Sequence, residues 1–241
     1  MDIRVKGMGE RVVIAGAGYA GLTASVVLDD KADLTLIERK HYHEILTRAH
    51  MVAGGIEYVQ EDVIPLGEVL KGRDTRIVHS TIRSINLNER KVSIYANDGT
   101  KDIYYDHFIL ALGAEVNYNV KGAREHAVGF RSIEDALSIY RRFKGMKDGG
   151  SMVVVGGGAT GISLAGAMAE LRSRLRKRVR ITVIEALDRI LDGWDGYIVE
   201  KARDILEGKS VDILTRRKVV EVRNGSVLLD GGEEVASDLT V

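Results

Sequence analysis

The chain has 241 residues, of which 35 are basic and 35 are acidic, and it contains no cysteine. The length allows one or two domains with a sizeable core, and a formal net charge of zero provides no field to attract nucleic acid or an anionic membrane. Without cysteine the chain forms no disulfide, thiolate metal site, iron–sulfur cluster or redox dithiol.

The first residues lack the apolar core of a signal peptide. No window of the sequence reaches the ~18 consecutive apolar residues of a membrane-spanning helix. We therefore predict a cytoplasmic protein, with peripheral contact to the cytoplasmic face of the membrane as the alternative.

An apolar strand is predicted over residues 11–15, followed by a helix over 22–28. Between them lies the turn Gly16-x-Gly18-x-x-Gly21, and the next apolar run, 34–37, ends at Glu38. In this order the glycines allow a tight turn, close approach of a diphosphate and close helix packing, while the helix N-terminus attracts phosphates. Glu38 follows the second strand, where a carboxylate accepts hydrogen bonds from ribose hydroxyls. We predict a dinucleotide site; a glycine-rich turn without a ligand is the alternative.

The segment after Glu38 contains three histidines, His41, His43 and His50. His43 and His50 would share one face of a helix, which suggests a metal site. No carboxylate or third histidine shares that face to complete a ligand set, and a metal also needs residues that orient its ligands. We therefore favour a loop that borders a ligand, and no metal.

Three runs, 76–87, 91–95 and 101–105, alternate imperfectly between apolar and polar residues and include the hairpin signal Asn97-Asp98-Gly99. They predict a small antiparallel sheet laid on the parallel one. The next run, 106–113, predicts a buried strand that ends in small residues. Its backbone at Ala111 and Gly113 could approach a flat or charged group, and a plain exit from the strand is the alternative.

Residues 117–126 are predicted to be a linker, and Ser132 is predicted to cap a helix over 132–143. The opening pattern then recurs, with a strand at 151–155, the turn Gly156-x-Gly158-x-x-Gly161, a helix over 162–175, and a strand over 181–184 that ends in Glu185. The recurrence predicts an internal duplication with two nucleotide sites. Glu185 favours a free ribose 2′-hydroxyl over a 2′-phosphate, and therefore NADH over NADPH.

A basic run with six Lys and Arg side chains lies between residues 172 and 180. Such a run could bind nucleic acid or lipid, but a solvated face that complements the helix dipole is the simpler interpretation. A helix over 202–206 and strands over 211–214, 218–222 and 226–229 follow, before a last apolar run at 239–241. Because that buried run stops with the sequence, we expect the chain to be a fragment of a longer protein.

The repeated pattern resembles the flavoproteins with two dinucleotide-binding domains, and most closely the type II NADH dehydrogenases (NADH:quinone oxidoreductases). The resemblance rests on both glycine turns with their acids, on Tyr42-His43-x-x-x-Thr47, and on the run 105–113 followed by Asn117-Tyr118 and Gly122. It implies an α/β fold with two Rossmann-like three-layer domains, each with a parallel sheet and a small antiparallel crossover sheet. The implied domains are an incomplete FAD-binding domain, 1–117, and an NADH-binding domain, 118–241.

By the same resemblance, the implied FAD contacts are Gly16, Ala17, Gly18, Tyr19, Ala20, Gly21, Glu38, Arg39, Thr47, Ile82, Ala111 and Gly113. The implied NADH contacts are Gly156, Gly158, Ala159, Thr160, Gly161 and Glu185. The implied reaction is hydride transfer from NADH to the flavin, followed by passage of the electrons to a quinone-like acceptor. The cofactors carry this chemistry, so no side-chain nucleophile is required.

Two features depart from this family. Ser163 stands where members often carry a glutamate, and the sequence has no Gly-Asp segment or quinone- and membrane-contacting helices after the second domain. A soluble NADH oxidase, a ferredoxin reductase and a non-catalytic nucleotide-binding module are the alternatives. Disulfide reductases and sulfide:quinone oxidoreductases need cysteines that this chain lacks. A homodimer and membrane contact through a missing C-terminal region stay open, and no nucleic-acid partner is expected.

Overall fold

The structure is a computed structural model that describes residues 9–56 and 59–241. Within these residues the chain divides into two compact units. The first comprises residues 9–44 and Val63–Ala114, and the second comprises Ile45–Asp62 and Glu115–Val241. Residues 45–62 therefore pack with the second unit, and a single boundary after residue 117 stays a prediction.

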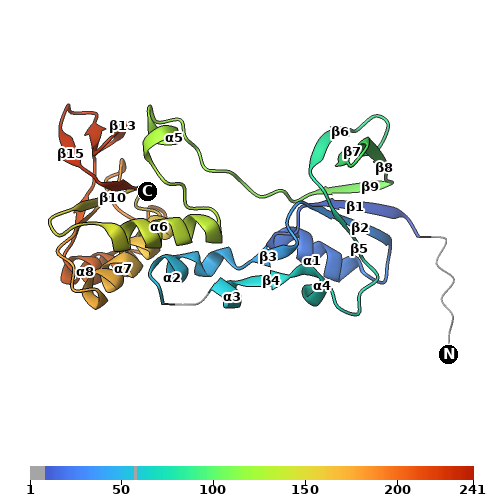
Figure 1. The fold of residues 1–241 in the computed structure, drawn as a ribbon, viewed down its shortest axis with the longest axis horizontal. Helices are drawn as coiled ribbons and strands as arrows, with labels where there is room; N and C mark the ends of the chain where they lie inside the picture. The colour runs from blue at the N-terminus through green and yellow to red at the C-terminus, as the bar shows by residue number, and fades with distance from the viewer. Residues whose placement is uncertain (1–8, 57–58) are drawn as a thin grey trace. The chain divides into compact units, whose positions relative to one another are not determined.

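The first unit is built on a parallel sheet with the strand order β5-β2-β1-β9. Its central strand is buried from Val12 to Ala15, as expected of a strand that is covered on both faces. Figure 1 shows helices on one face and three antiparallel strands on the other. The parallel strands are β1 (Arg11–Ala15), β2 (Asp33–Glu38), β5 (Arg76–His79) and β9 (His107–Leu110); the helices are α1 (Tyr19–Leu28) and α4 (Leu66–Val69); the antiparallel strands are β6 (Ile82–Asn86), β7 (Lys91–Ala96) and β8 (Gly99–Tyr104). A short pair, β3 (Tyr42–Glu44) and β4 (Val63–Pro65), completes the unit.

The second unit has the same plan, with a parallel sheet in the order β12-β11-β10-β16. The long helices cover one face, and a three-stranded antiparallel sheet covers the other (Figure 1). The parallel strands are β10 (Ser151–Val155), β11 (Arg180–Ile184), β12 (Val211–Leu214) and β16 (Leu239–Thr240); the long helices are α6 (Ile133–Gly145), α7 (Ala159–Arg174) and α8 (Gly196–Gly208); the antiparallel strands are β13 (Val219–Arg223), β14 (Ser226–Leu229) and β15 (Glu234–Ala236). Four short helices are η1 (Leu46–Arg48), α2 (Ala49–Ala53), α3 (Val59–Asp62) and α5 (Ala123–His126).

The two units repeat one topology. In each, a strand, a helix and a second strand lead to an outer strand, then to an antiparallel three-stranded sheet, and finally to a fourth strand beside the first. The parallel sheets, helices and antiparallel sheets form the three layers of a Rossmann-like α/β unit. The predicted fold class and internal duplication are confirmed.

Several predicted elements differ in detail. The run 76–87 is two strands, because β5 pairs with β2 in the parallel sheet whereas β6 pairs with β7. Residues 42–44 form a strand and His50 lies in α2, so the expectation that His43 and His50 share a helical face is wrong. The strand predicted over 106–113 ends at Leu110, and Gly113 has φ +76, a left-handed conformation that interrupts extended structure.

Asp106 ties the start of β9 to the start of β1. Its Oδ2 accepts hydrogen bonds from the backbone N–H of Arg11 at 2.9 Å and from Arg11 Nε at 3.0 Å, and its Oδ1 accepts one from Nη2 at 2.8 Å. Asp238 repeats this contact in the second unit, where its Oδ2 accepts a hydrogen bond from the backbone N–H of Ser151 at 2.8 Å. Each aspartate therefore fixes the register of the fourth strand against the first.

This contact predicts a pH-dependent stability. Hydrogen bonds from the Arg11 side chain and backbone lower the pKa of Asp106 from its usual range. A carboxyl group whose pKa falls on folding stabilises the native state above its unfolded-state pKa, about 4, and loses that contribution as the pH falls further. We expect Asp106→Asn to lower the melting temperature at pH 7, with the gap to the wild type narrowing below pH about 4.

Thermal unfolding of both proteins between pH 7 and pH 3 tests this expectation. Asp204→Asn is a matched control, because Asp204 is exposed on α8 and has no hydrogen bond or ion pair to another residue that the structure describes. A gap for Asp106→Asn that is as large at pH 3 as at pH 7 would contradict the assignment.

Candidate functional site

The first glycine turn joins β1 to α1 by close backbone contacts. Gly16 has φ +99, and its N–H donates a hydrogen bond to the Ile37 carbonyl at 2.8 Å. A Cβ atom at Gly21 would overlap the carbonyl oxygen of Gly16, whereas one at Gly18 would meet no atom within 4 Å. The helix has no side-chain N-cap, so its first N–H groups face the open space at Gly18 without a side-chain acceptor.

The second glycine turn repeats these features between β10 and α7. Gly156 has φ +110, and its N–H donates a hydrogen bond to the Ile184 carbonyl at 2.8 Å. A Cβ atom at Gly161 would overlap the carbonyl oxygen of Gly156, and the space at Gly158 is open. Helix α7 also lacks a side-chain N-cap. Each turn can therefore receive an anion at a helix N-terminus.

The two acids point toward their own turns. Glu38 Oε2 accepts a hydrogen bond from the Ala17 N–H at 2.8 Å, and its Oε1 accepts one from the Lys40 N–H at 3.0 Å. Glu185 Oε2 accepts a hydrogen bond from the Gly157 N–H at 2.6 Å, and its Oε1 accepts one from the Leu187 N–H at 2.8 Å. Each carboxylate oxygen keeps a further lone pair. Both acids are thus held in place and can still accept hydrogen bonds from a ligand.

The segment after Glu38 packs against the first turn through His43. Its Nδ1 lies 3.0 Å from the Ala17 carbonyl oxygen, and its ring meets the Tyr19 ring edge-on with centroids 4.9 Å apart. The exit of β9 lies on another side of the turn, because the Ala111 N–H donates a hydrogen bond to the Ala15 carbonyl at 2.8 Å. The structure therefore brings His43 and Ala111 to the first glycine turn.

The other predicted contacts are more dispersed. Tyr19 and Ala20 are exposed at the start of α1, Arg39 is exposed after Glu38, and Ile82 begins β6. Thr47 lies in η1 of the second unit, and its contact with a ligand of the first turn stays a prediction. In the second unit, Gly158, Ala159 and Thr160 are exposed at the start of α7.

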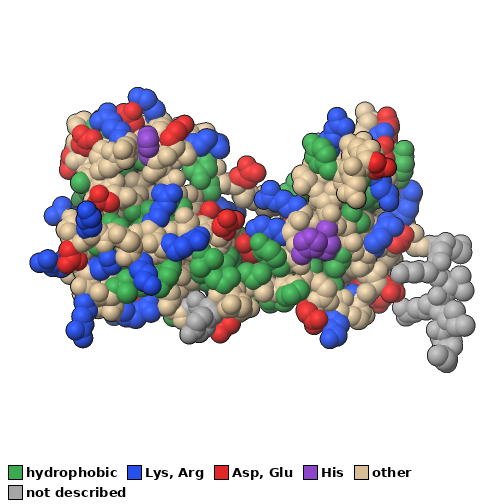
Figure 2. Space-filling model, in the orientation of Figure 1, with side chains coloured by type: hydrophobic (Ala, Val, Ile, Leu, Met, Phe, Trp, Pro, Cys, Tyr) green, Lys and Arg blue, Asp and Glu red, His purple; other side chains and the backbone are tan. Residues whose placement is uncertain are grey.

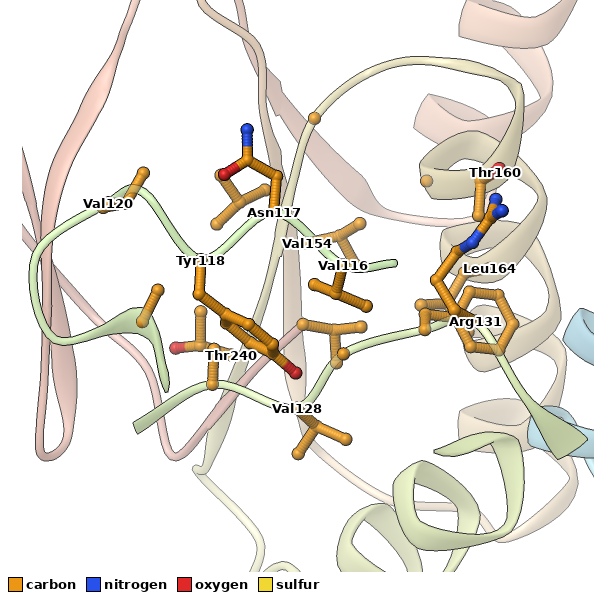
Figure 3. Close-up of a pocket in the computed structure, with 18 of the residues that line it drawn as sticks. Val116, Asn117, Tyr118, Val120, Val128, Arg131, Val154, Thr160, Leu164 and Thr240 are labelled. Carbon is orange, nitrogen blue, oxygen red and sulfur yellow. The ribbon is translucent and has the colours of Figure 1, made fainter. Parts of the chain in front are cut away.

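A cavity of about 440 Å³ adjoins the second turn (Figure 3). Gly156, Val154, Thr160 and Leu164 line it from the second turn and from β10 and α7, and two segments, 115–118 and 127–131, line much of the rest. Figure 3 shows Val116, Tyr118, Val128 and Arg131 around this space, with Arg131 on the same side as Thr160. The volume falls in the range of small-molecule sites, ~300–1,000 Å³.

Part of this lining comes from residues 117 and 118, in the segment that the sequence predicts to be a linker. Asn117 and Tyr118 line the cavity, and Tyr118 lies close enough to Gly129 that a Cβ there would meet its hydroxyl oxygen at 2.5 Å. A glycine opposite an aromatic side chain is the local signal that could have indicated this packing.

The basic run at the end of α7 makes contacts within the second unit. Arg172 Nη1 donates hydrogen bonds to the carbonyls of Val179 and Ser210, both at 3.1 Å, and Arg174 Nη1 donates one to the Gly55 carbonyl at 3.0 Å. Arg172 is half-buried, so the interpretation of a solvated face is wrong for it, whereas Arg174 is exposed; both guanidinium groups satisfy backbone carbonyls.

Acidic and basic side chains are interspersed on the face drawn in Figure 2. Across residues 9–56 and 59–241, no group of three or more His, Asp or Glu side chains is arranged to hold a metal ion. Over the same residues, no helix combines the length and the hydrophobicity that crossing a bilayer requires.

Comparisons with known proteins place these features in a family. The family described as pyridine nucleotide-disulphide oxidoreductase matches residues 10–241. Curated relatives include the type II NADH:quinone oxidoreductases of Staphylococcus haemolyticus (strain JCSC1435) and Staphylococcus aureus (strain NCTC 8325 / PS 47), each 28% identical over 235 residues. The matches cover 88% of this chain but 58% of each relative, so the chain spans little more than half of their length. The predicted resemblance is confirmed.

Solved structures give the same fold. NDH2 from Plasmodium falciparum in complex with NADH superposes with a TM-score of 0.85 at 19% identity, covering 97% of this chain and 54% of that chain. A NAD-dependent persulfide reductase from A. fulgidus superposes with a TM-score of 0.81 at 23% identity, covering 96% of this chain and 45% of that chain. At these identities the likeness shows the fold alone.

Proposed function

Because the chain belongs to the pyridine nucleotide-disulphide oxidoreductase family, we propose that its two glycine turns bind two dinucleotides, FAD in the first unit and NADH in the second. The protein takes a hydride from NADH to the flavin and passes the electrons to a quinone-like acceptor. One observation carries the proposal: each unit has an uncapped helix beside an open glycine and a carboxylate fixed at the same turn.

The residues fit the two cofactors for a physical reason. A diphosphate accepts hydrogen bonds from the first N–H groups of α1 or α7, and the open space at Gly18 or Gly158 allows its approach. The remaining lone pairs of Glu38 and Glu185 accept hydrogen bonds from the ribose hydroxyls. The other FAD contacts proposed from the sequence are Ala20, Arg39, Thr47, Ile82, Ala111 and Gly113.

When bound, the flavin and the nicotinamide supply the hydride chemistry themselves. The role of the protein is to hold, orient and shield the two rings. His43 and Ala111 brace the first turn, and the segments 115–118 and 127–131 line the cavity beside the second turn. No nucleophile or metal ligand is needed for these tasks.

Anaerobic titration with NADH tests the proposal. Purified protein supplied with FAD is expected to show flavin absorbance, which NADH bleaches. A preparation that takes up no FAD, or a bound flavin that NADH leaves oxidised, would contradict the proposed function. The acceptor is tested separately, by comparing NADH oxidation with a short-chain quinone and with dioxygen; the proposal expects the quinone to be the faster acceptor.

Glu185 supports a prediction about nucleotide choice. Glu185→Gln removes the negative charge that opposes a 2′-phosphate and weakens a charge-assisted hydrogen bond to the ribose. We expect the Kd for NADH to rise about tenfold, roughly 1.4 kcal/mol, and the Kd for NADPH to change less, so the preference for NADH narrows.

Fluorescence titration with NADH and with NADPH measures the ratio of the two Kd values. Glu38→Gln is the matched control, because Glu38 makes the equivalent contacts in the first unit and should leave the NADH to NADPH ratio unchanged. An unchanged ratio in Glu185→Gln would remove Glu185 from the proposed site.

A further inference from the structure

The second unit contains another cavity, of about 750 Å³, away from the glycine turn. Its walls are the strands β11 and β12 on one side and the strand β15 with the turn before it on the other. It shares no lining residue with the cavity beside Gly156. Thr182, within β11, lines this cavity. Glu185, past the end of the same strand, lies at the nucleotide turn and does not line it, so the two sites are separate.

Carboxylates dominate the charged side chains of this cavity. Four acids and one base, Arg180, line it. Asp212 has no hydrogen bond or ion pair from its side chain to another described residue. The other three acids each pair with an arginine outside the lining: Glu207 with Arg203 at 3.3 Å, Glu233 with Arg217 at 3.8 Å and Glu234 with Arg223 at 3.4 Å. Asp212 is therefore the carboxylate left without a counter-charge of its own.

Thr182 adds a buried polar group to the same wall. Its residue exposure is 4%, and its hydroxyl makes no hydrogen bond with any residue in the described ranges. Ile184, two residues along β11, packs against the antiparallel sheet. Since side chains alternate along a strand, Thr182 faces that side too, where the cavity lies. The side chain is mostly buried, and its hydroxyl is left to hydrogen-bond with whatever occupies the cavity.

The first unit contains the same position with a partner. Thr35 stands three residues before Glu38 as Thr182 stands three before Glu185, and Arg76 Nη2 donates a hydrogen bond to Thr35 Oγ1 at 2.8 Å. Arg76 is the residue beside Thr35 in the neighbouring strand, as Asp212 is beside Thr182. The second unit therefore has a carboxylate where the first has the guanidinium that fills the space.

We propose that this cavity binds a small organic cation that carries a guanidinium or primary ammonium group. The cation donates hydrogen bonds to the Asp212 carboxylate and to Thr182 Oγ1, and so takes the place that the Arg76 side chain takes in the first unit. Arg180 has the same charge as this ligand and opposes it from the same wall. The proposal does not depend on nucleotide binding.

Isothermal titration of the full chain with agmatine, at low salt and without nucleotide, tests the proposal. We expect saturable binding with one site. Asp212→Asn should weaken it at least tenfold, Thr182→Val should weaken it severalfold, and Arg180→Ala should strengthen it. Asp204→Asn removes an exposed carboxylate of the same unit outside the cavity and should leave binding unchanged.

The first two substitutions are nearly isosteric, and either one alone can decide the test if the other variant does not fold. Absence of saturable binding to the wild type would overturn the proposal. It would also be overturned if Asp212→Asn and Thr182→Val both bound agmatine as tightly as the wild type does. Excess NADH should leave the agmatine affinity unchanged. The result is therefore independent of whether the protein proves to be an NADH dehydrogenase.

Discussion

Gly21→Ala is expected to yield protein that no longer retains flavin. The added Cβ would overlap the carbonyl oxygen of Gly16, a backbone atom that cannot rotate away, so α1 must shift from β1. The shift displaces the N–H groups proposed to hold the diphosphate and strains a well-packed turn, at a cost of about 3 kcal/mol to the first unit. We expect FAD affinity to fall at least a hundredfold, measured by flavin absorbance per protein and by FAD titration.

Gly67→Ala provides the control for this variant. Gly67 lies in α4 of the same unit, and a Cβ there would meet no atom within 4 Å. Replacement of a helical glycine by alanine at an open position is neutral or favourable, by about 1 kcal/mol or less. A Gly21→Ala protein with the flavin content of Gly67→Ala would contradict the proposed FAD site.

Gly161→Ala is expected to weaken NADH binding and to leave FAD binding intact. Its Cβ would overlap the carbonyl oxygen of Gly156, so the start of α7 is displaced while the first unit is untouched. The protein should keep its flavin, bind NADH at least tenfold more weakly, and lose bleaching by NADH at concentrations that bleach the wild type. Titration of NADH against the flavin-loaded variant measures both effects.

The control for this second variant lies in the same helix. A Cβ at Gly166 would come no closer than 3.8 Å, to Leu206 Cδ2, which is ordinary contact. Gly166→Ala should therefore bind both cofactors as the wild type does. If Gly161→Ala lost flavin instead of NADH affinity, the assignment of FAD to the first turn and NADH to the second would be wrong.

The sequence predicts the two turns well because their geometry is local. Gly16 and Gly156 need positive φ, and Gly21 and Gly161 need the absence of a Cβ, and both requirements act within a few residues of the chain. The repeated order of strands and helices follows from apolar periodicity for the same reason.

Features that depend on distant contacts were harder to predict. Residues 76–79 join the parallel sheet only because β2 offers them an edge, and nothing in 76–87 marks the change of sheet. Residues 45–62 group with the second unit although they interrupt the first. The lining made by 115–118 and 127–131 also forms only when the chain has folded around β10 and α7. Periodicity carries no information about such pairings.

The interruption of the first unit by residues 45–62 limits how the protein can be divided. The polypeptide crosses between the units after Glu44, before Val63 and again after Ala114. One proteolytic cut near residue 114 would therefore release an N-terminal fragment that still carries α2, whose buried Val52 and Ala53 pack in the intact chain among α6 and α7. Such a fragment would expose an apolar helix without its partners and tend to aggregate. A single cut therefore cannot separate the two units intact, because residues 45–62 belong to the second unit but remain joined to the first.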